Sequence, residues 1–425
     1  MPSSVPWISR AAGLTARLGT AVTDGGRIGR LPRRTWHHLR TEAFGADPAG
    51  ERLARIERSP QFRDGAFRNP VPTRRLAAGC TPFSFSRARF SAGRARRVPA
   101  APVPLHPLRP IELAEPPASG LRLTWLCHAT VLAELDGRRV LFDPVWSERC
   151  SPFSWTGPKR LHPMPIALAE LGPVDVVVVS HDHYDHLDMP TVQALAATGT
   201  AFAVPLGVGA HLEHWGVPVQ RIVELDWWES AEVAGLTLTA TPARHYCSRG
   251  PRTHPYALWA SWVVAGPEHR VFHSGDTGYF PGFAEIGGRL GPFDATMVQI
   301  GAYSDLWPEV HMTPEEGVRA HLDLGGDLLL PIHWCTFDLA LHPWEEPAER
   351  TVAAAQALGA RFAVPRPGAP FEPADPPAPA LWWRAAAAVP RDGADLLVPD
   401  APAAGPAAAA GTGRAAAVDG DGITV

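Results

Sequence analysis

The chain has 425 residues, of which 45% are hydrophobic and 19% charged, so it can bury one large core or two modest ones. Its formal net charge of −4 excludes a general attraction to nucleic acid, and any basic surface has to be local. Its five cysteines are scattered and form no C-x-x-C pair, which argues against a disulfide framework and a cysteine-type zinc site. We therefore expect a globular protein of a reducing compartment, the cytoplasm.

The first zone, residues 1–118, is rich in Arg and Pro and shows weak periodicity. Arginines interrupt its apolar runs, so we expect neither a cleaved secretory signal nor a transmembrane helix. The stretch 83-FSFSRARFSAGRARR-97 interleaves Arg with Phe, and two interpretations stay open. It either contacts an anionic surface, such as lipid headgroups or a phosphate-bearing substrate, or is a solvated segment. We expect an irregular extension that packs on the main domain.

The second zone, residues 119–366, alternates short β-type runs with helical ones. The pattern predicts strands over 121–126, 131–142 as a hairpin, 174–180, 236–240, 257–264, 270–273, 294–300 and 328–333. It predicts helices over 190–198, 313–324 and 346–359, the second with Thr313, Pro314 and Glu316 in a capping-box pattern. This mixture indicates an α/β fold with two sheets and helices outside them.

The third zone, residues 367–425, is a low-complexity Ala/Pro/Gly tail that we expect to be disordered. The sequence contains no internal repeat. We therefore predict one folded domain, residues 119–366, between an extension and a tail.

The segment 180-SHDHYDHLD-188 follows the apolar run 174-VDVVVV-179 and has H-x-H-x-D-H spacing. On a loop, His181 and His183 can grip one ion while Asp185 and His186 reach a second ion beside it. Imidazole and carboxylate suit Zn²⁺ and also Fe or Mn. We expect Asp182 and Asp188 to shape the loop through hydrogen bonds.

Further ligand-type residues follow later predicted strands. His245 follows 236–240, Asp276 follows 270–273 and His333 follows 328–333. A lone histidine after a strand is more often a core or surface residue than a ligand. Several segments that all present ligand types at strand ends favour a metal site.

SHDHYDHLD together with 273-HSGDTGY-279 resembles the metallo-β-lactamase superfamily. Further stretches, such as 157-GPKR-160, 311-HMTPEEGVRAH-321 and 332-IHWCTF-337, resemble the subfamily that includes the N-acylphosphatidylethanolamine-hydrolysing phospholipase D and bacterial relatives. The likeness covers about residues 119–345, with 67-FRNP-70 as a fainter match. It implies a four-layer αβ/βα sandwich with metals at one edge of the two sheets.

The resemblance also implies a ligand set and catalytic groups. His181, His183 and His245 would bind one zinc, Asp185, His186 and His333 the other, and Asp276 both, with a bridging water. Two such ions would make that water a hydroxide nucleophile and stabilise charge on a phosphodiester. We expect Asp185, Asp276 and His311 to be the catalytic residues.

For three further residues, Asp143, His128 and His311, two interpretations each stay open. Asp143 ends a predicted strand and either orients a ligating imidazole or makes a turn, and His128 lies where it can approach the metals or the substrate. His311 precedes the capped helix, whose N-terminus favours a substrate phosphate, or it is a surface histidine. Related sequences usually carry Gly at Cys127 and Cys335, which bears on the loop geometry there.

The expected function is hydrolysis of a phosphodiester of phospholipid type by a dinuclear zinc enzyme. Two alternatives stay open. One is a lactonase acting on a phosphorylated sugar lactone, and the other is a non-catalytic metal-binding scaffold associated with a membrane. The expected partners are a small-molecule or lipid substrate and, peripherally, an anionic membrane, with no nucleic acid.

Overall fold

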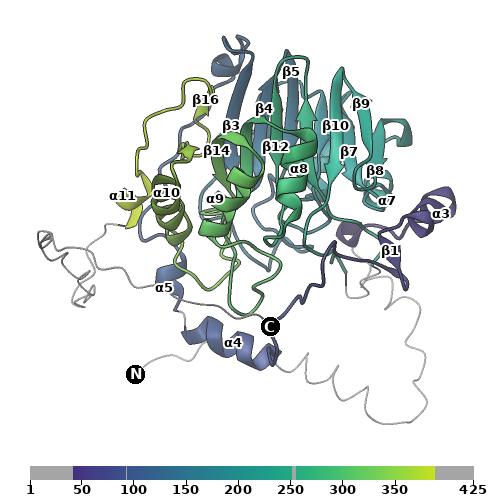
Figure 1. Ribbon diagram of the computed structural model, residues 1–425, viewed down its shortest axis with the longest axis horizontal. Coiled ribbons are helices and arrows are strands. Elements are labelled where there is room, and N and C mark those ends of the chain that lie inside the picture. The colour runs from purple at the N-terminus through teal and green to yellow at the C-terminus, as the bar shows by residue number, and fades with distance from the viewer. Residues whose placement is uncertain (1–41, 92, 251–254, 388–425) are drawn as a thin grey trace, which may run out of the picture. The chain divides into compact units, whose positions relative to one another are not determined.

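The computed structural model describes residues 42–91, 93–250 and 255–387 and contains two seven-stranded mixed sheets (Figure 1). The first sheet has the order β16-β3-β4-β5-β6-β7-β8 and the second β15-β14-β13-β12-β11-β10-β9. The strands of the first sheet are β3 (Leu121–Cys127), β4 (Thr130–Leu135), β5 (Arg138–Phe142), β6 (Val176–Val178), β7 (Ala201–Pro205), β8 (Ile222–Leu225) and β16 (Pro370–Phe371). Those of the second are β9 (Ser230–Val233), β10 (Leu236–Thr241), β11 (Ser261–Ala265), β12 (Arg270–His273), β13 (Phe293–Gln299), β14 (Gly326–Ile332) and β15 (Arg361–Phe362).

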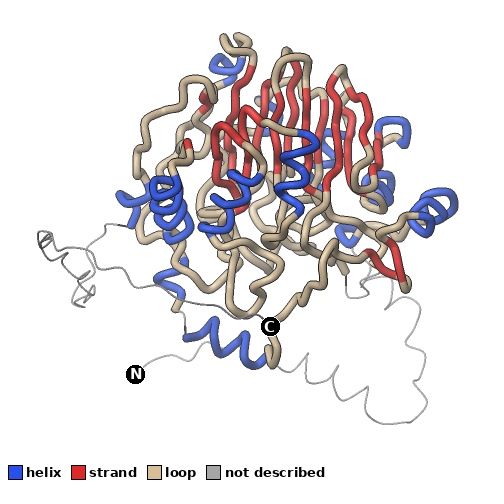
Figure 2. Tube along the Cα trace, in the orientation of Figure 1, coloured by secondary structure: helices blue, strands red, loops and turns tan. Residues whose placement is uncertain are grey.

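The two sheets are built alike, because each combines an antiparallel half with a parallel half. In the first sheet β3, β4 and β5 are antiparallel neighbours, whereas β5 to β8 are parallel. In the second sheet β9 to β12 are antiparallel, whereas β12 to β15 are parallel. The carboxyl ends of β3, β5 and β6 therefore lie at the same end of the first sheet. Those of β10, β12 and β14 lie at the same end of the second sheet. The loops that leave these ends gather below the sheets in Figure 2.

Helices lie outside both sheets. Their bounds are α6 (Met189–Ala196), α7 (Gly209–His214), α8 (Gly282–Leu290), α9 (Pro314–Asp323) and α10 (Glu346–Leu358). Phe283 of α8 and Val318 of α9 pack with Phe272 and Phe293 of the second sheet in a core of their own. Helices α6 and α7 connect the parallel strands β6, β7 and β8. Because such connections are right-handed as a rule, both helices belong to one face of the first sheet. The predicted α/β class and four-layer sandwich are confirmed.

The main core lies between the two sheets. Trp125, Leu141, Trp262, Met297 and Leu330 are fully buried in it. Burial of a side chain such as leucine or methionine contributes roughly 1.5–3 kcal/mol to stability. The strand ends that carry the loops are therefore fixed from behind by close packing.

Residues 42–118 pack on the main sheets. They include α3 (Gly50–Arg58), β1 (Phe62–Arg63), β2 (Ala66–Phe67), α4 (Pro82–Ser91) and α5 (Arg94–Arg97). Arg52 Nε lies 2.5 Å from Glu224 Oε2, and the ring of Phe62 stacks on Tyr256 with centroids 5.7 Å apart. Among the described helices, none combines the length and apolarity needed to span a bilayer.

The predicted strand 257–264 is wrong in its first half. Strand β11 begins only at Ser261, because Leu258 and Ala260 donate their amides to Leu206 and Ser180 of the first sheet's loops instead of to β10. Short elements such as β7 to β9 and α8 were not predicted. Helix α8 has the sequence GFAEIGGRL, whose glycines are weak helix formers, and it forms because Phe283 and Ile286 are buried.

The predicted tail begins too early. Strand β16 pairs with β3, and α11 (Trp383–Ala387) buries its tryptophan. The ring of Trp382 stacks on Trp334, which stacks in turn on Trp125, at centroid distances of 5.4 Å. Two large indole rings supply enough apolar surface to order this Ala/Pro-rich segment. Residues 388–425 lie outside the described residues.

Candidate metal centre

The loop 180–188 is held in a compact turn directly after β6. The amide of Val179 donates to Ala203, and Asp143 accepts the Ser180 amide at 2.7 Å. Asp182 Oδ1 accepts the Ser248 amide, and Asp188 Oδ2 accepts the Thr191 hydroxyl and the Ser147 amide. The prediction that Asp182 and Asp188 shape the loop is confirmed.

One group of potential ligands consists of His181, His183, His245 and Asp276, whose ligand atoms all lie within 4.8 Å of one another. His183 Nδ1 is 2.9 Å from His181 Nε2 and 3.2 Å from His245 Nε2. Asp276 Oδ2 lies 3.9 Å from His181 Nε2 and 3.8 Å from His245 Nε2. Three imidazoles and a carboxylate oxygen therefore converge on one point.

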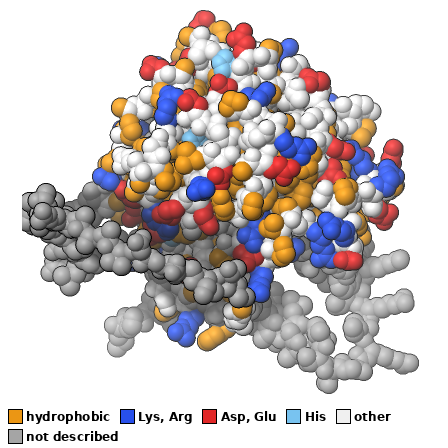
Figure 3. Space-filling model, in the orientation of Figure 1, with side chains coloured by type: hydrophobic (Ala, Val, Ile, Leu, Met, Phe, Trp, Pro, Cys, Tyr) orange, Lys and Arg blue, Asp and Glu red, His pale blue; other side chains and the backbone are white. Residues whose placement is uncertain are grey.

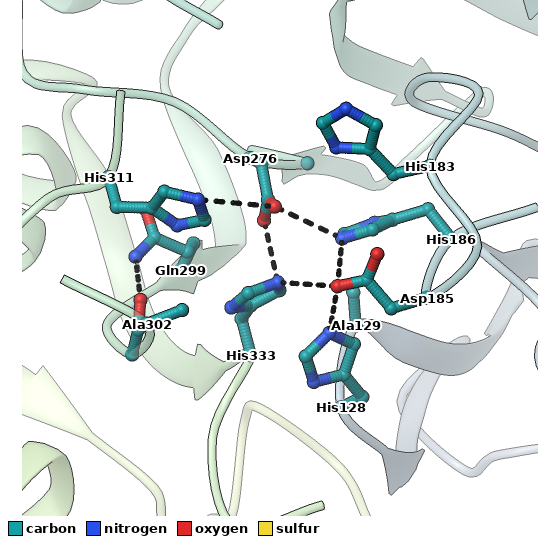
Figure 4. Close-up of polar contacts among 12 residues, drawn as sticks. His128, Ala129, His183, Asp185, His186, Asp276, Gln299, Ala302, His311 and His333 are labelled. Carbon is teal, nitrogen blue, oxygen red and sulfur yellow. Dashed lines mark hydrogen bonds and ion pairs between the residues drawn. The ribbon is translucent and has the colours of Figure 1, made fainter. Parts of the chain in front are cut away.

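A second group lies on the other side of Asp276. Asp185, His186, His333 and His128 have ligand atoms within 4.8 Å of one another. Asp185 Oδ2 is 3.6 Å from His186 Nε2 and 3.5 Å from His333 Nε2. Asp276 Oδ1 is 2.9 Å from His333 Nε2, and its Oδ2 is 3.2 Å from His186 Nε2. Figure 4 shows Asp276 between His311, His186 and His333, with Asp185 facing His128.

The ligand atoms themselves fit a metal better than they fit one another. His186 Nε2, His333 Nε2 and Asp276 Oδ1 are buried, and none has a hydrogen-bond partner within the described residues, although they lie close together. Buried polar atoms without hydrogen bonds cost about 1–3 kcal/mol each. Imidazole and carboxylate donors that converge without bonding to each other fit a divalent cation.

Other side chains orient the imidazoles. His186 donates from Nδ1 to Asp143 Oδ2 at 2.7 Å, and His245 donates from Nδ1 to the Val310 carbonyl at 3.0 Å. His181 Nδ1 lies 2.9 Å from the Ser180 hydroxyl, which itself donates to Asp143. These bonds assign the proton to Nδ1 of His186 and His245, so that Nε2 presents a lone pair to the centre.

The charges of the centre depend on each other. Burial would raise the pKa of Asp276, but the imidazoles of His186, His333 and His311 hold it well below its usual range. Burial would lower the pKa of His186, but Asp276, Asp185 and Asp143 together raise it well above its usual range. A metal that binds there would displace a proton, because a protonated imidazole cannot be a ligand.

Comparison with known proteins agrees with this geometry. A model of the β-lactamase superfamily domain matches residues 138–334. An uncharacterized protein of Mycobacterium tuberculosis is 50% identical over 362 residues, covering 82% of this chain and 93% of its own length. The chain belongs to the metallo-β-lactamase superfamily.

Two further relatives extend this comparison. The N-acyl-phosphatidylethanolamine-hydrolyzing phospholipase D 1 of Caenorhabditis elegans is 40% identical over 233 residues, which is 52% of this chain and 65% of the worm protein. A UPF0173 metal-dependent hydrolase of Methanopyrus kandleri is 28% identical over 256 residues, which is 59% of this chain and 100% of that protein. Within the metallo-β-lactamase superfamily, this chain is a metal-dependent hydrolase.

His128 and His311 lie at the centre of this metallo-β-lactamase site. His128 Nε2 is 2.9 Å from Asp185 Oδ2, and burial lowers the pKa of His128 to about 3. His311 Nε2 is 3.9 Å from Asp276 Oδ2, and burial lowers the pKa of His311 to about 4. Both imidazoles are therefore neutral near pH 7, and the interpretation of His311 as a surface histidine is wrong.

The N-terminus of α9 offers less to an anion than expected. The hydroxyl of Thr313 accepts the Glu316 amide, and the Glu316 carboxylate accepts the Thr313 amide at 2.9 Å. This capping box occupies the first-turn amides and adds negative charge. The two cations of the motif 157-GPKR-160 bond to groups of the chain. Lys159 pairs with Glu148 at 2.7 Å, and Arg160 donates to the Ser147 carbonyl.

The two cysteines at usual glycine positions differ in backbone conformation. Cys335 has φ +57°, a left-handed conformation that glycine adopts at least cost, whereas Cys127 ends β3 and the positive φ falls on His128. Burial raises the pKa of the Cys335 thiol well above its usual range. The thiol therefore stays protonated, and a protonated thiol is a weak competitor for zinc because the thiolate is the metal ligand.

Asn69, in the motif FRNP, holds the loop of a ligand. Its amide oxygen accepts the His245 backbone N–H, and its amide nitrogen donates to the His245 carbonyl, both at 2.8 Å. Asn69 also accepts the indole N–H of Trp259 at 3.1 Å. The sequence marked this segment only by a faint family likeness, because no pattern relates positions so far apart in the chain.

We expect Asn69→Ala to lower stability by about 1–3 kcal/mol, because it leaves the backbone N–H and carbonyl of His245 unpaired, whereas the Trp259 indole keeps its bond to the Ala243 carbonyl. We also expect turnover to fall roughly tenfold, because His245 is held less firmly. Urea unfolding and steady-state kinetics measure these effects. Asn69→Asp tests the two bonds separately, since it keeps the acceptor of the His245 N–H and replaces the donor to the His245 carbonyl with a charged oxygen. Wild-type stability and turnover in Asn69→Ala would contradict the role assigned to this side chain.

Proposed function

We propose that the chain is a dinuclear zinc hydrolase that acts on a phosphodiester of phospholipid type. The observation that carries the proposal is the position of Asp276, which belongs to the ligand group of His181, His183 and His245 and lies within 3.2 Å of His186 and His333 of the second group. The choice of substrate is supported by the 40% identity to a protein whose name states hydrolysis of N-acyl-phosphatidylethanolamine. The donor set, histidine and aspartate, suits zinc and also iron or manganese.

In this proposal each ligand has a defined role. His181, His183 and His245 would hold one ion, Asp185, His186 and His333 would hold the other, and Asp276 would contribute to both. When bound, two such ions lower the pKa of a water and stabilise charge on attacking and leaving oxygens, which suits a diester. The chain then needs no serine or cysteine nucleophile.

Other residues of the chain position these groups and the substrate. Asp143 keeps the proton of His186 on Nδ1, and His128 Nε2 contacts the Asp185 carboxylate at 2.9 Å. His311 is the group we propose to contact the substrate phosphoryl oxygens, because its Nδ1 is buried without a hydrogen-bond partner among the described residues. A neutral imidazole donates one hydrogen bond there without neutralising Asp276.

The proposal is tested by metal analysis and a substrate panel on the full chain loaded with zinc. We expect two zinc ions per chain and turnover of bis(p-nitrophenyl) phosphate and of N-acylated phosphatidylethanolamine in mixed micelles. Turnover of phosphorylated sugar lactones without any diester hydrolysis would replace the proposal with a lactonase. Fewer than two metals per chain without hydrolysis of any substrate would identify a scaffold.

A further inference from the structure

Helix α4 exposes two phenylalanines on one face. Phe83 is 78% exposed and Phe90 is 91% exposed. Seven residues are two helical turns, so both rings lie on the same side of the helix, and Arg87 lies between them, one turn after Phe83. Two largely exposed aromatic rings on one helix face indicate a surface that another apolar phase covers.

The helix is anchored beside the metal centre. Arg89 Nη2 is 2.9 Å from Asp338 Oδ2, and Arg97 Nη1 is 2.8 Å from both oxygens of Asp338. A pocket next to this anchor is lined by Arg97, Asp338, Leu339, His128 and His333. It therefore reaches from the α4–α5 segment to two residues of the centre. In Figure 1, α4 and α5 lie below the strand ends.

The charge of this segment selects the kind of partner. The stretch 83–97 contains five arginines and no acidic residue, although the chain as a whole carries a net charge of −4. Arg87 and Arg96 are exposed, and orange and blue side chains stand together at the position of α4 in Figure 3. Aromatic rings among arginines match the boundary between headgroups and acyl chains in an anionic bilayer.

We propose that α4 docks the enzyme on an anionic lipid bilayer. Phe83 and Phe90 enter the acyl boundary, while Arg87 and Arg96 contact headgroup phosphates. The pocket lined by Arg97 and Asp338, and on its other side by His128 and His333, then lies toward the membrane. The use of this docking for catalysis rests on the proposed function, whereas the docking itself does not.

The test is co-sedimentation of the full chain with vesicles of phosphatidylcholine containing about one third phosphatidylglycerol, and with pure phosphatidylcholine. We expect binding to the anionic vesicles, at least about tenfold weaker binding for the double variant Phe83→Ala/Phe90→Ala, and roughly fivefold weaker binding for Arg87→Ala. The control is Leu358→Ala. The Leu358 side chain is 53% exposed and lies at the end of α10, shortly before β15. Because β15 runs parallel to β14, it begins at the end of the sheet opposite the metal centre. Leu358→Ala should bind as the wild type does.

Equal binding of the double variant and the wild type would overturn the proposal, and so would an equal loss in Leu358→Ala. If the double variant binds the vesicles as tightly as the wild type and salt releases both completely, the arginines alone account for the binding. The segment would then be a general anion-binding surface that also binds nucleic acid. Thermal unfolding checks that the double variant folds, which we expect because both rings are exposed. Vesicle binding without diester hydrolysis would refute the proposed function but not the docking. Diester hydrolysis without vesicle binding would refute the docking but not the proposed function.

Discussion

Asp276→Ala will lose both metal ions and turnover together. The Asp276 side chain is 1% exposed, and its oxygens lie 2.9 Å from His333 Nε2 and 3.2 Å from His186 Nε2. It belongs to the ligand group of His181, His183 and His245, and its Oδ1 also lies 2.9 Å from His333 Nε2 of the second group. Its loss leaves a cluster of buried imidazoles without a shared anion, so that two adjacent cations are no longer balanced.

We expect zinc to fall from two to below one per chain and kcat/KM to fall on the order of 10³-fold or more. Zinc content by elemental analysis and turnover of bis(p-nitrophenyl) phosphate measure both effects on the same sample. Asp182→Asn is the matched control: Asp182 is also buried and in the ligand loop, but it accepts the Ser248 amide and belongs to neither ligand group. Retained zinc and turnover in Asp276→Ala would contradict the assignment of Asp276 as a ligand shared by both ions.

Asp143→Asn will weaken the metal group that contains His186. Asp143 Oδ2 accepts the Nδ1 proton of His186 at 2.7 Å, and both groups are fully buried. Asparagine has nearly the same shape, and it tolerates the left-handed φ of +40° that Asp143 adopts. The oxygen of the new asparagine keeps the bond from the Ser180 amide, so its N–H₂ group takes the place of Oδ2. It then donates to His186 Nδ1, where the carboxylate accepted. His186 then accepts at Nδ1 and carries its proton on Nε2, which is the ligand atom.

Loss of such a supporting carboxylate typically costs about 10- to 100-fold in metal affinity or activity. We expect one zinc per chain to be held as in the wild type and the other to be lost first during titration with a chelator. Ser180→Ala is the control, because it removes one hydrogen bond to Asp143 and cannot reverse the tautomer of His186. Equal chelator resistance of both ions in Asp143→Asn would show that Asp143 only makes a turn.

Both interpretations of Asp143 proved to have a structural basis. Its positive φ makes the turn after β5, and its carboxylate bonds His186. The sequence placed Asp143 at a strand end, but it contained no signal that β5 and β6 are neighbours in the sheet. Parallel pairing of β5 with β6 is a tertiary property, and it brings Asp143 and Ser180 to hydrogen-bonding distance.

The chain's own residues determined the fold class and the positions of ligand-type side chains, because strand periodicity and H-x-H-x-D-H spacing are local features. Local patterns do not specify which loop lies against which. Asn69 beside His245, Arg97 beside Asp338 and Trp382 beside Trp334 are separated by long stretches of chain. Only packing of the two sheets, which brings six strand ends to one edge, decides these pairs, since contact there depends on long-range burial and not on neighbouring residues.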